Sequence, residues 1–149
     1  MIHPKGWLRI LCERFQVSLH LGVVRVRQII RTADAPMSAS FSQAIKAGST
    51  VYVSGTTGID PKTNQMAGST IQEQTRQALI NCRNILRAAD ADLSHVVDVH
   101  VLLASPGDFT GLNEEWAKFF PSDPPARAVG KLGVELPNLL VSIKMTAVL

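Results

Sequence analysis

The chain has 149 residues, of which 46% are hydrophobic and 18% charged, and this composition fits one globular domain with a sizeable core. The net charge of +3 suggests nucleic-acid binding only until it is divided along the chain. Residues 1–31 carry six basic residues and one acidic residue, a net charge of +5, whereas residues 32–149 carry nine basic and eleven acidic residues, a net charge of −2. Because basic and aromatic residues are not interleaved along the chain, we expect no surface that binds nucleic acid.

The first 21 residues contain neither a continuous apolar run nor a small-residue cleavage site, so they predict neither a signal peptide nor a membrane span, and we expect a cytoplasmic protein. Apolar residues at near-helical spacing leave open an organelle presequence or an amphipathic arm: Trp7, Leu8, Leu11 and Phe15. We favour a dispensable extension over residues 1–22, followed by a single domain over residues 23–149.

The first half of this domain has the pattern of three strands. Val24–Ile29 alternates in character and is followed by a turn that ends at Pro36. Phe41–Lys46 and Thr50–Gly55 predict a hairpin around a short turn that contains glycine. Asp60–Asn64 predicts another turn.

Two helices are predicted. Thr70 and Glu73 form the capping-box pattern that begins a helix. The residues that follow it at helical spacing predict one buried face: Ile71, Ala78, Leu79, Cys82, Ile85, Leu86 and Ala89. Ser105 as N-cap and Pro106 at the first helical position predict a second helix that ends near Phe120.

Two further strands follow from alternation. In Val96–Leu103 we expect Val97, Val99, Val101 and Leu103 on one face, with Val96, Asp98, His100 and Leu102 on the other. The last strand places Ser142, Lys144 and Thr146 opposite Val141, Ile143, Met145 and Ala147. The order β-β-β-α-β-α-β-β predicts an α/β (α+β) fold, a single sheet with two helices on one face. The other face is of mixed polarity and suggests a subunit interface, with sites between subunits.

Arg127 is the strongest candidate for ligand binding. It follows Pro124 and Pro125, which hold the chain extended and direct it into a strand, and it lies far from any basic run. Its fork of donors matches the two oxygens of a small carboxylate. Residue type alone favours the alternative of a solvated surface ion pair.

The sequence gives little support for a metal site, a phosphate-binding loop or a catalytic nucleophile. His95 and His100 are five residues apart, so on one strand they would point to opposite faces and could not share a metal. There is no HExxH motif, phosphate-binding glycine loop, GxSxG elbow or CxxC pair. Ser54 has no partnered His and Asp, and on residue type alone Ser54 is a strand-end hydroxyl and Asn113 an exposed helix residue. We therefore expect no metal, cofactor or covalent nucleophile.

Three groups of residues nevertheless resemble a known family when their order is considered. They are Val53-Ser54-Gly55 followed by Asp60–Thr63, Phe109–Phe120 with Asn113, and Pro125-Ala126-Arg127 followed by Leu136-Pro137. From Val24 to Leu149 the chain resembles the YjgF/YER/Rid family of reactive intermediate deaminases. The resemblance implies a chorismate-mutase-like fold, a homotrimer with three clefts between subunits, and hydrolysis of 2-imino or enamine acids to 2-keto acids and ammonia.

The resemblance also implies roles for individual residues. Arg127 would bind the substrate carboxylate and act as the catalytic residue, and Gly55 would offer backbone groups near the imine. Ser54, Asn113 and Phe41 would line the pocket, with Phe41 where the family often has Tyr.

Two positions depart from the family pattern. Lys144 stands where deaminating members commonly carry a Glu thought to place the attacking water, and Val129 replaces a Cys found in many relatives. A lysine cannot accept that hydrogen bond. Lys144 could join Arg127 in holding a dicarboxylate, or it could pair at the interface with an acid such as Asp98.

Three functions therefore remain open: an imine deaminase, a non-catalytic trimer that binds small carboxylates as a sensor or chaperone, and, with least support, an RNA-acting protein.

Overall fold

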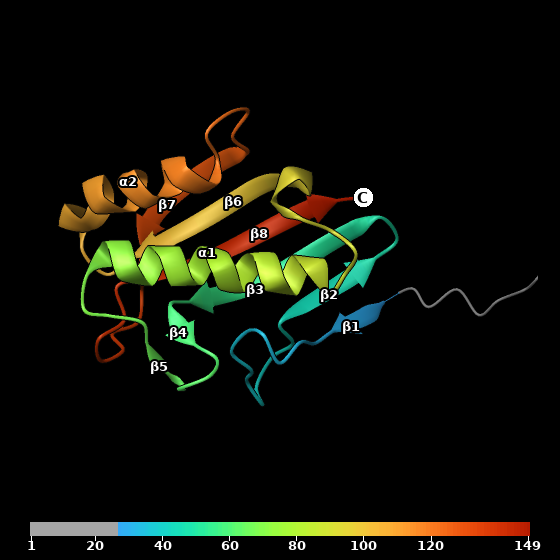
Figure 1. Cartoon of the computed structure of the whole chain (residues 1–149), viewed down its shortest axis with the longest axis horizontal. Helices are drawn as coiled ribbons and strands as arrows, with labels where there is room; N and C mark the ends of the chain where they lie inside the picture. The colour runs from blue at the N-terminus through green and yellow to red at the C-terminus, as the bar shows by residue number, and fades with distance from the viewer. Residues whose placement is uncertain (1–26) are drawn as a thin grey trace, which may run out of the picture.

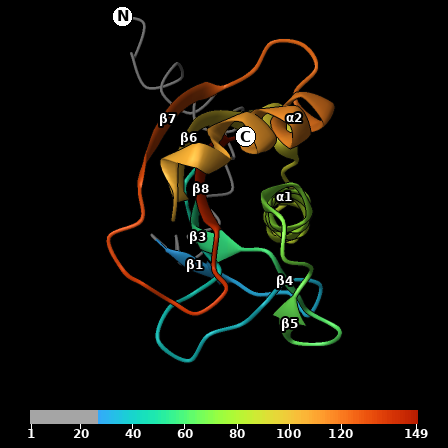
Figure 2. The same cartoon turned by 90° about the vertical axis from the view of Figure 1, so that its left-hand side faces the viewer.

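The computed structural model describes residues 27–149, in which a six-stranded sheet carries two helices on one face (Figures 1 and 2). The helices are α1 (Ile71–Arg87) and α2 (Phe109–Phe119). The strands of the sheet are β1 (Gln28–Ile30), β2 (Ala44–Ala47), β3 (Thr50–Thr57), β6 (Val96–Leu103), β7 (Ala126–Lys131) and β8 (Val141–Val148). The predicted α+β fold is confirmed. Val24, Val26 and the predicted extension over 1–22 lie outside the described residues.

The strand order is β1-β2-β3-β8-β6-β7, so the last strand in the chain lies at the centre of the sheet. β6 and β7 pair in parallel, and every other neighbouring pair is antiparallel. A parallel pair needs a crossover, which α2 supplies between β6 and β7. The predicted hairpin joins β2 to β3 through a turn in which Gly48 has φ +59°, a conformation that favours glycine.

α1 begins at the predicted capping box. The backbone nitrogen of Glu73 donates to Oγ1 of Thr70 (3.3 Å), and the nitrogen of Thr70 donates to Oε2 of Glu73 (3.0 Å). Its apolar face packs on β3 and β8 and buries Leu79, Cys82 and Leu86 completely. Burial raises the pKa of the Cys82 thiol to about 12, so this cysteine is a core residue, as its place in the pattern indicated.

The second helix begins later than predicted. Ser105 and Pro106 open a 3₁₀ turn over Pro106–Asp108, with Oγ of Ser105 accepting from the nitrogen of Gly107 (3.2 Å), and α2 starts at Phe109. α2 packs against α1, and the rings of Trp116 and Phe120 at its end lie 4.4 Å apart.

A second, two-stranded sheet was not predicted. β4 (Ile59–Asp60) and β5 (Gln65–Met66) flank the predicted turn and pair antiparallel. Asn81, which is fully buried on α1, fixes the entry to this hairpin because its Nδ2 donates to the carbonyls of Thr57 (2.9 Å) and Ile59 (2.8 Å).

One prediction about the faces of β6 was wrong. The register between β6 and β8 shifts between Val96 and Asp98, so Val96 is buried and Val97 is 49% exposed. A bulge adds one residue and reverses the alternation on one side of it. Strict alternation holds only from Asp98 onward, with Val99, Val101 and Leu103 in the core.

The face of the sheet away from the helices, here called the outer face, is of mixed polarity as predicted. Tyr52 of β3, Lys144 of β8, and His100 and Leu102 of β6 are exposed on it. Nε2 of His100 lies 3.2 Å from Oδ2 of Asp98. Such a mixed face is typical of a subunit interface.

Candidate functional site

Arg127 lies in β7, opposite Val99 of β6, and directs its guanidinium over α2 on the helix side of the sheet. Its Nη2 donates to Oδ1 of Asn113 (2.8 Å), and its Cζ lies 4.7 Å from the centroid of the Trp116 ring. Asn113 and Trp116 are three residues apart on α2 and therefore share a helix face. The structure thus brings together two of the predicted site residues, Arg127 and Asn113.

The second terminal nitrogen of Arg127, Nη1, is buried and makes no hydrogen bond within the described residues. No carboxylate of residues 27–149 forms an ion pair with this guanidinium. Partial burial lowers the pKa of Arg127, but a guanidinium stays charged in proteins. The arrangement is a partly buried cation with a free donor, which does not fit the alternative of a solvated surface ion pair and which suits an anionic ligand.

The carboxylate of Glu115, which precedes Trp116 in the sequence, already has hydrogen-bond partners. Glu115 is buried on α2 and accepts hydrogen bonds from Nε (3.0 Å) and Nη2 (2.8 Å) of Arg76 and from Nζ of Lys118 (2.6 Å). The hydrogen bonds from Arg76 hold the pKa of Glu115 below its usual value. Glu115 therefore clamps α2 to α1 and keeps Asn113 and Trp116 in position.

An apolar cavity of about 410 Å³ lies at the end of β7 that follows Arg127, and Arg127 itself does not line it. Val129 is two residues further along the strand and shares the face of Arg127, so it faces this cavity together with Phe109, Pro106 and Leu103. The valine that departs from the family pattern gives the cavity an apolar wall and leaves it without a thiol.

Ser54, Gly55 and Phe41 form a second group, at β3. They line a cavity of about 200 Å³. Oγ of Ser54 donates to the carbonyl of Ser42 (2.7 Å), so its hydrogen is committed and its lone pairs remain free to accept. The register of β3 shifts between Val53 and Thr56, and a Cβ added at Gly55 would lie 3.0 Å from Oγ of Ser142. A side chain at Gly55 would therefore crowd the hydroxyl of Ser142 on β8.

The loop that carries Phe41 is anchored by Gln43. The side chain of Gln43 is buried, and its Nε2 donates to the carbonyls of Thr32 (3.0 Å), Ala35 (2.9 Å) and Pro36 (3.0 Å). Its Oε1 accepts from the nitrogen of Thr32 (2.7 Å). One side chain therefore fixes the start of the segment between β1 and β2 that forms the wall of this cavity.

Lys144 lies apart from both groups. It is exposed on the outer face of β8, opposite His100, whereas Arg127 points to the helix side, so the two cations of one chain lie on opposite faces of the sheet. Lys144 makes no ion pair within residues 27–149, and Asp98 pairs with His100 instead. Within one chain, Lys144 therefore neither joins Arg127 in holding a dicarboxylate nor pairs with Asp98.

The predicted site residues are therefore divided between two regions of one chain. β3 and β7 are separated by β8 and β6, which corresponds to roughly 14 Å at about 4.8 Å per strand. Arg127 and Asn113 lie near the β7 edge of the sheet. Phe41, Ser54 and Gly55 lie closer to the β1 edge. A ligand as small as a three- or four-carbon acid could touch both groups only if they came from two copies of the chain.

Two residues that shape the site were missed in the sequence. Trp116 was not singled out in the sequence, although its spacing of three from Asn113 could have placed both under one guanidinium. Gln43 carries no sequence signal for its role, because its four partners are backbone groups of a loop.

The described residues contain no cluster of three or more His, Cys, Asp or Glu side chains placed to hold a metal ion. Over the same residues, neither helix combines the length and the apolar character needed to cross a bilayer.

Comparison with known proteins gives consistent matches. Residues 32–149 match the family model described as endoribonuclease L-PSP. The chain is 42% identical over 104 residues to the 2-iminobutanoate/2-iminopropanoate deaminase of Capra hircus, covering 69% of this chain and 76% of that protein. It is 36% identical over 124 residues to the protein of the same name from Homo sapiens, covering 83% and 90%. The crystal structure of RidA from an Antarctic Psychrobacter aligns with a TM-score of 0.77 at 33% identity, covering 82% of this chain and 99% of that one.

Proposed function

Because the chain belongs to the endoribonuclease L-PSP family, the YjgF/Rid family of the resemblance, we propose that it hydrolyses reactive 2-imino acids to 2-keto acids and ammonia. Relatives at 36% and 42% identity carry the name of such a deaminase. The Rid fold expected from the resemblance is the fold found here, with similar solved structures.

The observation that carries the proposal is the free Nη1 of Arg127, buried beside an Nη2 that Asn113 already holds. A carboxylate that reached Nη1 would satisfy a buried donor and neutralise a partly desolvated cation in one contact. Trp116 below the guanidinium restricts its motion. The pre-positioned fork reduces the entropy lost when the acid binds.

Imine hydrolysis depends more on a water molecule held in the right position than on a strong acid, base or nucleophile. Water adds to the imine carbon and gives a carbinolamine. The proton of its hydroxyl passes to the nitrogen, the carbon–nitrogen bond breaks, and ammonia leaves as the carbonyl of the 2-keto acid forms. Holding the acid and the water in one orientation supplies most of the acceleration. Ser54, whose hydrogen is committed to the carbonyl of Ser42, can accept a hydrogen bond from that water or from the imine N–H, and the backbone of Gly55 lies beside it.

We propose that these two groups meet between copies of the chain in a homotrimer. The separation of Arg127 from Ser54 within one chain and the mixed outer face both support an assembled site. One copy would supply Arg127 and Asn113, and its neighbour would supply Phe41, Ser54 and Gly55.

A second candidate function is binding of small carboxylates without turnover. Lys144, at the position where deaminating relatives commonly carry Glu, is exposed and cannot accept a hydrogen bond from water. Arg127 would bind the same acids in either function, so only the rate of imine hydrolysis distinguishes the two candidates.

The test is release of ammonia and keto acid from 2-iminobutanoate generated in place by an amino-acid oxidase, with semicarbazide as the competing trap. Wild type should shorten the lifetime of the imine, Arg127→Ala should not, and the surface variant Arg87→Ala should match wild type. Binding of 2-oxobutanoate by wild type without any change in imine lifetime would reject the deaminase in favour of the second candidate. Cleavage of a single-stranded oligoribonucleotide in a parallel reaction would support the RNA-acting alternative.

A further inference from the structure

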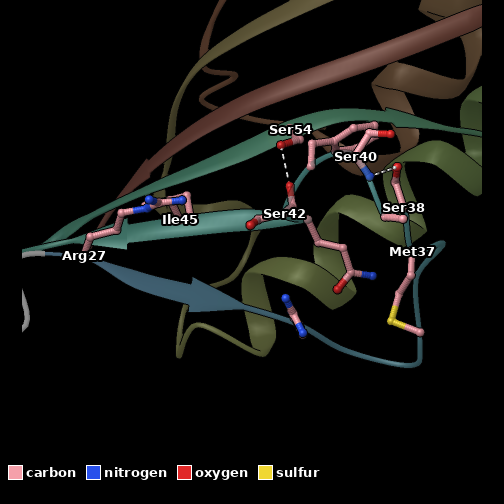
Figure 3. Close-up of a pocket in the computed structure, with 11 residues that line it drawn as sticks. Arg27, Met37, Ser38, Ser40, Ser42, Ile45 and Ser54 are labelled. Atoms are coloured by element: carbon pink, nitrogen blue, oxygen red, sulfur yellow. Dashed lines mark hydrogen bonds between the residues drawn. The ribbon is translucent and has the colours of Figure 1, made fainter.

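A further cavity, larger than the two described above, is not explained by a small monocarboxylic acid. It encloses about 730 Å³ between β1, β2 and the loop between them. Figure 3 shows Arg27 and Ile45 at one end of it and Met37, Ser38 and Ser40 at the other, with Ser42 and Ser54 between them. Arg31 and Phe41 also line it. A cavity of this size is typical of ligand sites in proteins.

The strand register places both arginines on the side of the sheet where the subunit interface is proposed. Ile29 pairs with Ile45, and Ile45 pairs with Tyr52, which is exposed on the outer face. Arg27 and Arg31 lie two residues before and two residues after Ile29, so alternation directs them to this same face. The buried neighbour Ile30 points the other way, into the core.

The charge of this cavity is entirely positive. No Asp or Glu is among its lining residues, and neither arginine forms an ion pair within residues 27–149. Ser38 adds a donor, because its Oγ already accepts from the nitrogen of Ser40 (3.1 Å) and its hydrogen stays free. Guanidinium and hydroxyl donors together suit a carboxylate or a phosphate.

The cavity is continuous with the proposed substrate site. It shares Met37, Ser38, Phe41, Gln43 and Ser54 with the cavity of about 200 Å³ that contains Gly55. A ligand whose reacting carbon lay at Gly55 and Ser54 would therefore extend its side chain past Phe41 towards the arginines.

We infer that Arg31 and Arg27 form a subsite for a second anionic group, so that the substrate is a 2-imino acid whose side chain ends in a carboxylate or a phosphate. This inference rests on the proposed function, since it takes the first carboxylate to be held by Arg127 of a neighbouring copy. In this proposal, a preference for dicarboxylates comes from Arg27 and Arg31 and not from Lys144.

The two arginines should contribute unequally. The backbone nitrogen of Ser54 donates to the carbonyl of Gln43 (2.9 Å). The last pair of β1 and β2 is Ile30 with Ala44, so Arg31, which follows Ile30, lies near Gln43. Arg27 lies four residues earlier, roughly 13 Å along the strand. Arg31 should therefore bind the terminal anionic group of a substrate with a short side chain. Arg27 should bind that of a substrate with a longer side chain.

The experiment compares 2-oxoglutarate and 2-oxo-4-phosphonobutanoate with the neutral 2-oxopentanoate by calorimetric titration. The corresponding imines, generated in place, are compared by rate. The variants are Arg31→Gln, Arg27→Gln and the control Arg87→Gln, which removes the same charge from an exposed residue of α1. Circular dichroism and light scattering confirm that each variant folds and assembles as wild type does.

We expect wild type to bind both dianions at least tenfold more tightly than 2-oxopentanoate. Arg31→Gln should remove this preference while leaving 2-oxopentanoate unchanged, and Arg27→Gln should weaken it by a smaller factor. Equal affinity of wild type for dianions and 2-oxopentanoate, or a preference that survives both substitutions, would overturn the subsite. If no acid binds and no imine is hydrolysed, the proposed function itself fails, whereas hydrolysis of small monocarboxylic imines without dianion preference refutes the subsite alone.

Discussion

Replacing Gln43 with methionine isolates the contribution of one buried amide to the loop that carries Phe41. Methionine keeps the length and most of the volume of the side chain but can neither donate to the three carbonyls nor accept from the nitrogen of Thr32. The loop over residues 32–42 would lose its anchor while the strand pairing of β2 with β3 stays intact.

The expected loss of stability follows from the number of bonds. Nε2 has two hydrogens for three carbonyl partners, so two full bonds and one shared contact, together with the bond to Oε1, amount to about three effective hydrogen bonds. At about 1 kcal/mol of net stability each, the substitution should lower the free energy of unfolding by about 3 kcal/mol. Water can reach some of these groups once the loop opens, which makes this figure an upper value.

Urea unfolding at one fixed protein concentration measures the change, with Gln65→Met as the control because Gln65 is exposed on β5. Hydrogen exchange at the amide of Thr32 should accelerate in Gln43→Met and stay unchanged in the control. A loss below about 0.5 kcal/mol, with the Thr32 amide still protected, would refute the assignment of Gln43 as the anchor, since surface substitutions fall in that range.

Three further outcomes are expected. Lys144→Glu should raise the rate of imine hydrolysis by restoring an acceptor for water, and a semicarbazide-trapping assay that shows no change in rate or substrate ranking would place Lys144 outside the chemistry. A chain that lacks residues 1–22 should elute in light-scattering gel filtration with the mass of three chains, and a monomer at micromolar concentration would remove the basis for an intersubunit site. The thiol of Cys82 should resist a disulfide reagent at pH 8 in a Cys12→Ser chain and react fully in urea, because its pKa of about 12 and its burial keep it protonated and inaccessible; rapid reaction of the folded protein would contradict its place in the core.

The parts of the fold that could be predicted are those in which local pattern and tertiary packing agree. The capping box at Thr70 and the apolar stripe through Leu79 and Leu86 determine α1 almost to the residue. Alternation in Val141–Val148 gives β8, because the helix-side positions of a central strand must be apolar. Two helices and one sheet then leave one face open, as the structure shows.

Features that depend on non-local geometry could not be predicted. The bulge at Val97 leaves the composition of β6 unchanged and depends on its register with β8. The β4–β5 hairpin consists of two-residue strands, too short for a periodic signal. Arg127 and Asn113 were paired only through the resemblance, because the contact between a strand and a helix 14 residues earlier is set by the crossover at β6–β7. The cavity with Arg27 and Arg31 went unpredicted because its wall is an irregular loop.

Binding of a small 2-keto acid to Arg127 tests the proposed chemistry most directly, by calorimetric titration of 2-oxobutanoate into wild type, Arg127→Ala and Arg127→Lys. Loss of the charge-assisted pair should cost at least about 2 kcal/mol, or roughly a 30-fold rise in Kd, in the alanine variant. The lysine variant should recover little, because a point charge lacks the fork that reaches both Asn113 and the ligand. Equal affinity of wild type and Arg127→Ala for 2-oxobutanoate would contradict the assignment of the free guanidinium nitrogen as the carboxylate site.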